Sequence, residues 1–228
     1  MHVEVVENVL KLNDDVARRN RAVLHEAGVF TIDLLGGPGC GKTTLVERTL
    51  AALRAELRIA VIVGDLATAR DAQRIARHCP HVVQVNTGKG CHLEAHQVRQ
   101  AMERIDLHQT DLLIIENVGN LVCPVGFDLG QDVKVGMFST TEGADKPAKY
   151  PYMVHESDVV LLNKTDLLPY VPFDVNQFDT DVRRLRPDAT VLRCSAYLNK
   201  LDSWLDWLRA RAAAPAEISA PYTKANPR

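Results

Sequence analysis

A glycine-rich segment at residues 36–43 has the residue types and spacing needed to bind phosphate groups. It reads Gly36-Gly37-Pro38-Gly39-Cys40-Gly41-Lys42-Thr43 and matches the pattern G-x-x-x-x-G-K-[ST] at every position. Glycines let the backbone approach a ligand closely, so that its N–H groups can surround phosphate oxygens. We expect Lys42 to reach the outer phosphates and the Thr43 hydroxyl to bind Mg2+, with Thr44 also among the nucleotide-binding residues. Cys40 fills a free position of the pattern and is interpreted as a small tolerated residue.

Two acidic residues at the ends of apolar runs are candidates for binding the same Mg2+ ion. Asp65 ends the run 61–65 and Glu116 ends the run 112–116. The carboxyl ends of strands in an open α/β sheet face the ligand crevice, although a strand-end acid can also simply begin a turn. Residues 116–119 have the form E-x-x-G, in which the Gly119 N–H can sense a γ-phosphate. The predicted catalytic residues are Lys42, Thr43, Asp65, Glu116 and Gly119.

The segment Asn163-Lys164-Thr165-Asp166 follows another apolar run and has the N-K-x-D pattern of guanine-specific GTPases. The Asp166 carboxylate can accept two hydrogen bonds, from guanine N1–H and the exocyclic amine, and adenine does not offer this pair. The stem of Lys164 can cover the base while Asn163 braces the loop. Farther along, Ser195 and Ala196 fit an S-A element that contacts guanine O6 through the backbone. The sequence therefore predicts GTP and GDP as ligands, not ATP.

Thiol and imidazole side chains occur near two of these segments. Cys91 and His92 are expected to open a helix, with His96 on the same helical face, and Cys123 lies in the loop after Glu116. Such donors suit Zn2+ and Ni2+ better than Mg2+ or Ca2+. From spacing alone, an equally good interpretation is a packed Cys123 and a solvated helix face.

The elements that must position these residues alternate along the chain. Apolar strands are predicted near residues 29–35, 59–63, 82–85, 112–115, 133–138, 159–162 and 190–192. Helical patterns are predicted at 9–26, 43–56, 68–78, 91–104 and 199–210. Unbroken apolar strands alternating with helices indicate a mostly parallel sheet covered on both faces, which is a three-layer α/β P-loop fold.

Length and composition favour one soluble domain. The 228 residues are 46% hydrophobic and 25% charged, and the net charge of −2 gives no reason to expect nucleic acid or an acidic membrane as partner. No apolar stretch approaches the ~20 residues that span a bilayer, and five cysteines, an odd number, argue against a disulfide framework. We expect a cytoplasmic protein with an amphipathic helix packing on the core at 1–27, a GTPase domain at 28–211 and a disordered tail at 212–228.

The sequence resembles the HypB family, accessory GTPases of [NiFe]-hydrogenase maturation, from about residue 8 to residue 208. The segments that carry the resemblance are Gly37–Thr44, Asn86–His92, Glu116–Pro124, Thr141–Pro147 and Asn163–Asp166. The resemblance implies a SIMIBI-type G domain that hydrolyses GTP and delivers nickel to a hydrogenase large-subunit precursor, together with other accessory proteins.

The resemblance also implies how the metal is bound. In that family a cysteine–histidine pair and a later cysteine form a Ni2+ or Zn2+ site at a GTP-dependent homodimer interface, which here corresponds to Cys91, His92 and Cys123. His96 matches an additional ligand of some members. Leu167, Leu168 and Val171 look like that family's dimer contacts, and their alternative role is ordinary anchoring of the loop.

The chain departs from the family pattern at two places. It begins without the cysteine-rich or histidine-rich segment that many members use for tight nickel binding, and residues 63–68 differ from the usual sequence around Asp65. Cys79-Pro80-His81 is similar to a metal motif of urease GTPases but lies at a different place in the chain, so a metal role there is the less favoured interpretation. No arginine is obviously placed to assist hydrolysis, which is expected to be slow, and Lys146 or Lys149 could approach the phosphates. The alternative functions are nickel delivery to urease and metal storage or buffering.

Overall fold

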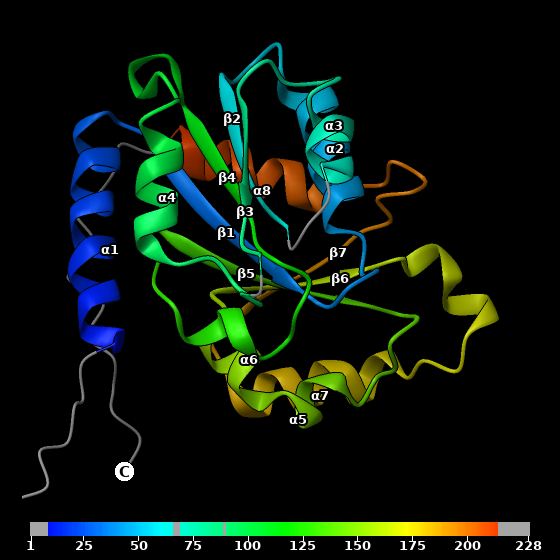
Figure 1. Ribbon diagram of the computed structural model, residues 1–228. Coiled ribbons are helices and arrows are strands. Elements are labelled where there is room, and N and C mark those ends of the chain that lie inside the picture. The colour runs from blue at the N-terminus through cyan, green and yellow to red at the C-terminus, as the bar shows by residue number, and fades with distance from the viewer. Residues whose placement is uncertain (1–8, 66–68, 89, 214–228) are drawn as a thin grey trace, which may run out of the picture.

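Within the described residues, 9–65, 69–88 and 90–213, a seven-stranded parallel sheet forms the centre of the computed structural model (Figure 1). The strand order is β3-β2-β4-β1-β5-β6-β7. The strands are β1 (Phe30–Gly36), β2 (Ile59–Asp65), β3 (Val82–Asn86), β4 (Leu112–Glu116), β5 (Val133–Ser139), β6 (Val159–Asn163) and β7 (Thr190–Arg193). The predicted α/β fold with a central parallel sheet is confirmed.

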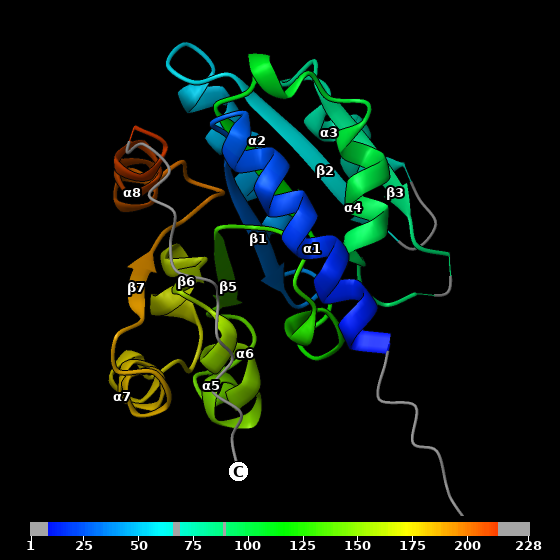
Figure 2. The same cartoon turned by 90° about the vertical axis from the view of Figure 1, so that its left-hand side faces the viewer.

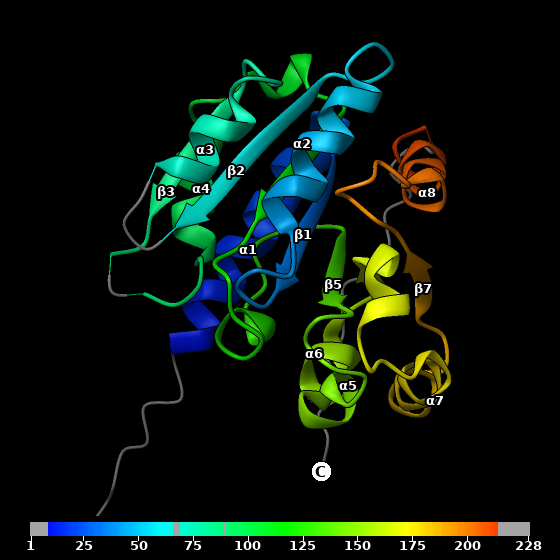
Figure 3. The same ribbon diagram turned by 90° about the vertical axis from the view of Figure 1, so that its right-hand side faces the viewer.

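Helices cover both faces of the sheet because most strands are apolar on both sides. On one face, Ile59, Val61 and Val63 of β2 pack into a core with α2 (Lys42–Leu53), α3 (Arg70–Ile75) and α8 (Asp202–Ala212). The alternate residues Ala60 and Ile62 face α1 (Val9–Glu26) and α4 (Ala95–Met102) on the other face. Figure 2 shows α1 beside α4, and Figure 3 shows α2 and α3 on the opposite side.

The half of the sheet formed by β5, β6 and β7 has its own helical cover, on the same face as α1. It consists of α5 (Lys146–Lys149), α6 (Pro151–Glu156) and α7 (Val175–Leu185). Phe178 of α7 packs edge-on against Phe138 of β5, with ring centroids 5.8 Å apart. Short 3-10 helices lie in the loops: η1 (Leu107–Gln109), η2 (Cys123–Gly126) and η3 (Thr165–Tyr170).

Several predicted helix boundaries were wrong by a few residues. The helix predicted at 199–210 begins at Asp202, because Asn199 has a left-handed φ of 57° and Lys200 pairs with Ser195. The helix predicted at 68–78 covers only Arg70–Ile75, and the one predicted at 43–56 ends at Leu53. The proposed tail lies outside the described residues from position 214 on, as do residues 66–68 of the segment that departs from the family pattern. No helix in the described part of the chain is long and apolar enough to cross a bilayer.

Helix α1 is attached to the main body through both apolar and polar contacts. Leu24 is fully buried against the sheet, whereas Leu12 on the same helix is 68% exposed. The Asn20 amide donates to the carbonyl oxygens of Ala95 and Leu129, at 2.8 and 3.0 Å. Asn13 accepts the Ala95 N–H at 2.8 Å, so α1 also fixes the point at which α4 begins.

A pair of leucine substitutions tests this attachment. Leu24→Ala is expected to lower the free energy of unfolding by about 2–5 kcal/mol, because it leaves a cavity under α1. Leu12→Ala removes the same atoms from an exposed position and should change it by less than about 0.5 kcal/mol. Urea denaturation of both variants measures the difference, and equal effects would show that α1 does not pack on the sheet as described.

Candidate nucleotide site and metal-binding loops

A cavity of about 740 Å3 opens at the carboxyl edge of the sheet, between the loops that follow β1, β2, β4 and β6. Its volume is in the range of ordinary small-molecule sites. The strand register produces this gathering, since Leu34 and Val63 both pair with Glu116, and Ser139 pairs with Asn163. The predicted residues in its wall are Pro38, Gly39, Gly41, Lys42, Thr43, Thr44, Asp65, Glu116, Gly119, Asn163, Lys164, Asp166 and Ala196.

The glycine-rich loop has the backbone geometry that its sequence predicts. Gly39 and Gly41 have φ angles of +77° and +105°, which residues with a Cβ rarely adopt, and Gly41 caps the start of α2. A Cβ on Gly41 would lie 2.5 Å from the Asn163 side-chain nitrogen. The Lys42 ammonium group is buried and donates to the carbonyl oxygens of Gly36 and Gly37, at 3.0 and 3.4 Å. The loop is therefore folded around its own lysine.

The remaining predicted residues of the loop, Gly36, Gly37 and Cys40, are buried behind the cavity wall. Burial raises the pKa of the Cys40 thiol, which packs in the apolar core beside α2. A thiol of raised pKa is a poor nucleophile at neutral pH. This environment is that of a packing residue.

Glu116 and Thr43 form a donor set that fits a hard divalent cation. The Thr43 hydroxyl donates to Glu116 Oε1 at 2.7 Å, while Oε2 is buried and has no hydrogen-bond partner among the described residues. Burial raises the pKa of Glu116 to about 7, and the Thr43 hydrogen bond and Lys42 act in the opposite direction. Asp65 reaches the same cavity from the end of β2. Oxygen donors of this kind are the ligands that Mg2+ prefers.

The side chains of the N-K-x-D segment join three loops around the cavity. Asn163 donates to the Cys40 carbonyl oxygen at 2.9 Å and accepts the Ala196 N–H at 3.0 Å. Lys164, in the left-handed conformation, donates to the Gly39 carbonyl oxygen at 2.7 Å. The Ser195 hydroxyl is buried and donates to Asp166, so its side chain orients the carboxylate. Ser195 itself is not part of the cavity wall.

The prediction that Cys91 and His92 open a helix was wrong. Helix α4 begins at Ala95, since the Leu93 N–H donates to Asn117 Oδ1 at 3.1 Å and the Glu94 N–H to the Gln97 side chain at 2.9 Å. His92 therefore lies in the loop and does not share a helical face with His96. The His96 side chain is 57% exposed and lies 3.3 Å from a Glu94 oxygen.

The structure places Cys91 close to Cys123 and to His92. The Cys123 thiol is close enough to raise the pKa of Cys91, mainly through a side-chain hydrogen bond, and Cys91 Sγ lies 3.7 Å from His92 Nδ1. Asn120 Oδ1 accepts the Val122 and Cys123 N–H groups, at 2.8 and 3.3 Å, and so sets the turn that carries Cys123.

His92 has an environment that favours the neutral, metal-binding form of the ring. Its ring stacks on Phe127 with centroids 3.9 Å apart, and burial lowers its pKa. Its Nε2 atom is buried and lacks a hydrogen-bond partner among the described residues. Across those residues, however, no group of three or more His, Cys, Asp and Glu side chains is arranged to hold a metal ion by itself.

Cavity residues that the sequence analysis missed include Asp71 and Arg74 of α3. The Arg74 guanidinium donates to Glu47 at 3.1 and 2.6 Å and to the Thr44 hydroxyl at 3.2 Å. The sequence gives no signal for Arg74, because its proximity to the phosphate loop depends on how α3 packs against α2. Asn117 was also missed as a functional residue, although it directly follows Glu116.

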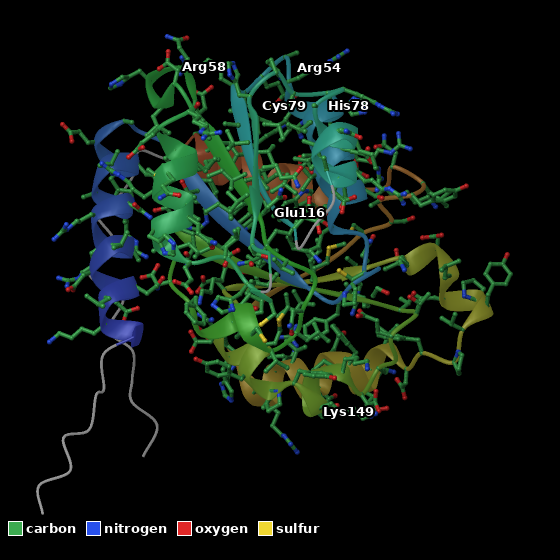
Figure 4. All side chains as sticks on the ribbon, in the orientation of Figure 1. Arg54, Arg58, His78, Cys79, Glu116 and Lys149 are labelled. Atoms are coloured by element: carbon green, nitrogen blue, oxygen red, sulfur yellow. The ribbon has the colours of Figure 1, made fainter. Side chains whose placement is uncertain are left out.

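Two weaker sequence candidates lie away from this cavity. Cys79 is buried and its thiol lies 3.0 Å from the Ile59 carbonyl oxygen, in the wall of a separate cavity of about 400 Å3. Figure 4 shows Cys79 and His78 at the opposite end of the sheet from Glu116. Lys149, the last residue of α5, lies at the surface in the same view and pairs with Asp145 at 2.5 Å. Neither Lys146 nor Lys149 lines the nucleotide cavity.

Comparison with known proteins agrees with this geometry. The family described as "CobW/HypB/UreG, nucleotide-binding domain" matches residues 30–193. The hydrogenase maturation factor HypB of Azotobacter chroococcum mcd 1 is 47% identical over 213 residues, which is 93% of this chain and 70% of that protein. The chain belongs to the HypB family. Its members are hydrogenase maturation factors with a nucleotide-binding P-loop fold.

Two solved structures of HypB proteins resemble the chain over almost its full length. The one from Archaeoglobus fulgidus has a TM-score of 0.83 and 36% identity, covering 89% of this chain and 100% of its own. The one from Helicobacter pylori, solved in complex with nickel, has a TM-score of 0.84 and 33% identity, covering 88% and 95%.

The buried carboxyl group of Glu116 leads to a prediction about pH. The folded protein keeps a proton on this group up to about pH 7, whereas the unfolded chain releases it near 4.5. Folding stability should therefore fall as the pH rises through this interval. Glu116→Gln should flatten that fall in urea denaturation without nucleotide or Mg2+. Asp33, whose pKa burial also raises to about 7, leaves a residual slope. Equal slopes in the wild type and the variant would contradict the assignment.

Proposed function

We propose that the protein is a GTP-hydrolysing metallochaperone that delivers nickel to a hydrogenase precursor. The observation that carries the proposal is the position of Cys123, four residues after Gly119 in the loop that follows Glu116. The thiol donor and the predicted γ-phosphate sensor thus belong to one continuous backbone segment. Membership of a family of hydrogenase maturation factors supports the choice of cargo. The cytoplasm is the compartment in which such free thiols persist.

The nucleotide site would hold GTP with the phosphates in the glycine-rich loop. Lys42 would leave its carbonyl partners for the outer phosphates, and Thr43, Asp65 and Glu116 would hold Mg2+. The ion, when bound, neutralises charge that develops on the phosphate oxygens during hydrolysis to GDP and phosphate. A Cβ on Gly119 would lie 3.1 Å from Pro38 Cα, so the sensor loop rests directly on the phosphate loop. This contact lets Gly119 offer its N–H to a terminal phosphate.

The metal site would be completed by a second copy of the chain. Cys91, His92 and Cys123 give an incomplete set in one protomer, and a symmetric dimer would supply the same three donors from both sides. Thiolate and imidazole donors suit nickel, with Zn2+ as a competitor for the same site. Tyr170 is 81% exposed beside Leu167, Leu168 and Val171, which favours this segment as the homodimer contact.

The transfer of nickel would depend on the nucleotide state. When the γ-phosphate leaves, the loop after Glu116 can relax and shift Cys123 relative to Cys91 and His92. A site that loses one thiolate binds its ion less tightly and releases it to an acceptor, which we propose is the hydrogenase large-subunit precursor, assisted by other maturation proteins. Linkage requires the reverse effect as well, so nickel should alter nucleotide binding or dimerisation.

Replacing one carboxylate oxygen of Asp166 by an amide nitrogen tests the prediction that this residue binds guanine. Asp166→Asn should weaken GTP binding by about 10- to 100-fold, because an amide cannot accept from both N1–H and the exocyclic amine. The same variant should bind xanthosine triphosphate better than the wild type does, since the amide can donate to the 2-oxo group. Competition binding with both nucleotides measures the switch. Asp188→Asn, whose side chain is 79% exposed, is the control. Unchanged GTP affinity in Asp166→Asn would refute the assignment.

The metal assignment can be tested with two cysteine variants. With a non-hydrolysable GTP analogue and Mg2+, the wild type should form a dimer that binds Ni2+, and Cys123→Ser should weaken Ni2+ binding by at least about tenfold. Cys79→Ser, in which the hydroxyl can donate to Ile59, should leave it unchanged. Ni2+ titration combined with molar-mass measurement reports both properties. Ni2+ affinity that is identical in the nucleotide-free, GDP and GTP-analogue states would defeat the delivery mechanism.

A further inference from the structure

A buried amide, the side chain of Asn117, connects the loop that carries Cys91 and His92 to the loop that follows Glu116. Asn117 is 1% exposed. Its Oδ1 atom accepts the Leu93 N–H at 3.1 Å and the Val118 N–H at 3.0 Å. Leu93 directly follows His92, and Val118 directly precedes Gly119. One oxygen atom therefore fixes the backbone of both loops.

The Leu93 side chain provides a second contact between the metal-binding loop and the nucleotide cavity. It packs on Gly64, where a Cβ would lie only 2.7 Å from Leu93 Cγ. Gly64 lines the cavity next to Asp65. The N–H of Thr87, in the segment that precedes Cys91, donates to the Asp65 carbonyl oxygen at 2.9 Å. The loop thus cannot move far without disturbing the end of β2.

Asp33, in the central strand β1, forms a hydrogen bond with the Asn117 side chain. Its Oδ1 atom accepts from Asn117 Nδ2 at 3.1 Å, and the residue is fully buried. Asp33 pairs with Lys134 in the register of β1 and β5, and the charge of Lys134 favours the ionised carboxylate. The buried Lys134 ammonium donates to the Val125 carbonyl oxygen at 2.7 Å, within the turn η2 that begins at Cys123.

These contacts join buried polar side chains to the backbone just after His92 and to the turn that begins at Cys123. Asn117 holds the segment with Cys91 and His92, Lys134 holds the turn with Cys123, and Asp33 lies between them. Removing a hydrogen-bond partner from a buried polar group costs free energy, because the group is left unsatisfied. The two loops therefore have few alternative arrangements. A shift of the Glu116–Gly119 segment must carry Leu93 with it or break the shared hydrogen bond.

We propose that Asn117, Asp33 and Lys134 are positioning residues that transmit the nucleotide state to the metal-binding loops. The proposal rests on the proposed function, because it requires the metal-binding loops and the GTP site to be thermodynamically coupled. None of the three residues needs to touch the nucleotide or the nickel ion. Their role is to make the arrangement of one loop depend on that of the other.

The test measures coupling and not affinity alone. The dissociation constant for Ni2+ is determined with the GTP analogue and with GDP. The coupling factor is the value with GDP divided by the value with the GTP analogue. Couplings between sites are typically about 5- to 150-fold. We expect Asn117→Ala to bring the wild-type ratio close to one. Lys134→Met, which keeps the aliphatic stem, should lower the ratio in the same direction. Asp33→Asn, which retains an acceptor for Asn117, should preserve more of the ratio than Asp33→Ala does.

A matched control separates coupling from stability. Asn20→Ala also removes a buried amide with two hydrogen bonds, and its partners do not include Asn117, Asp33 or Lys134. It should lower the free energy of unfolding but leave the ratio at its wild-type value. If Asn117→Ala and Lys134→Met both fold and keep the wild-type ratio, the network is refuted while the proposed function stands. A wild-type ratio of one would instead overturn the proposed function, and the network with it.

Discussion

The position of β1 between β4 and β5 is the constraint on which the rest of the structure depends. From β1 the sheet extends in one direction through β4, β2 and β3, and in the other through β5, β6 and β7. The loop after β1 enters α2 on one face, while the loop after β4 packs through Val125 on the other face. Because these two loops go to opposite faces of the sheet, a crevice opens between them at the carboxyl edge, as at the switch point of other open α/β sheets.

The carboxyl groups of Asp33 and Glu116 are buried near this edge, and burial makes their ionised forms unfavourable. Burial raises the pKa of both Asp33 and Glu116 to about 7. Each has an oxygen atom without a hydrogen-bond partner among the described residues. The two positions differ in what can compensate the charge. Glu116 lines the nucleotide cavity, whereas Asp33 lies inside the sheet beside Lys134 and Asn117. The position of Glu116 therefore suits a ligand site, and the position of Asp33 suits a rigid internal support.

The segments that carry Cys91, His92 and Cys123 adjoin the nucleotide cavity because they are continuous with, or pack against, the strands that form its wall. Residues 116–123 run from the carboxylate at the end of β4 to the thiol of Cys123, and Leu93 packs against the end of β2. Short covalent connections and buried hydrogen bonds leave these loops little independent freedom.

The sequence by itself determined the parallel α/β fold and the residues that gather around the nucleotide cavity. Patterns such as 36–43 and 163–166 depend on local backbone geometry and strand ends, which are encoded within a few residues. Tertiary structure alone decided where α4 begins, because the Leu93 N–H is taken by Asn117, from a strand end 24 residues away. It likewise placed Arg74 beside Thr44 and Asp33 beside Asn117. Such contacts follow from strand order and helix packing, and those join residues that no local spacing relates.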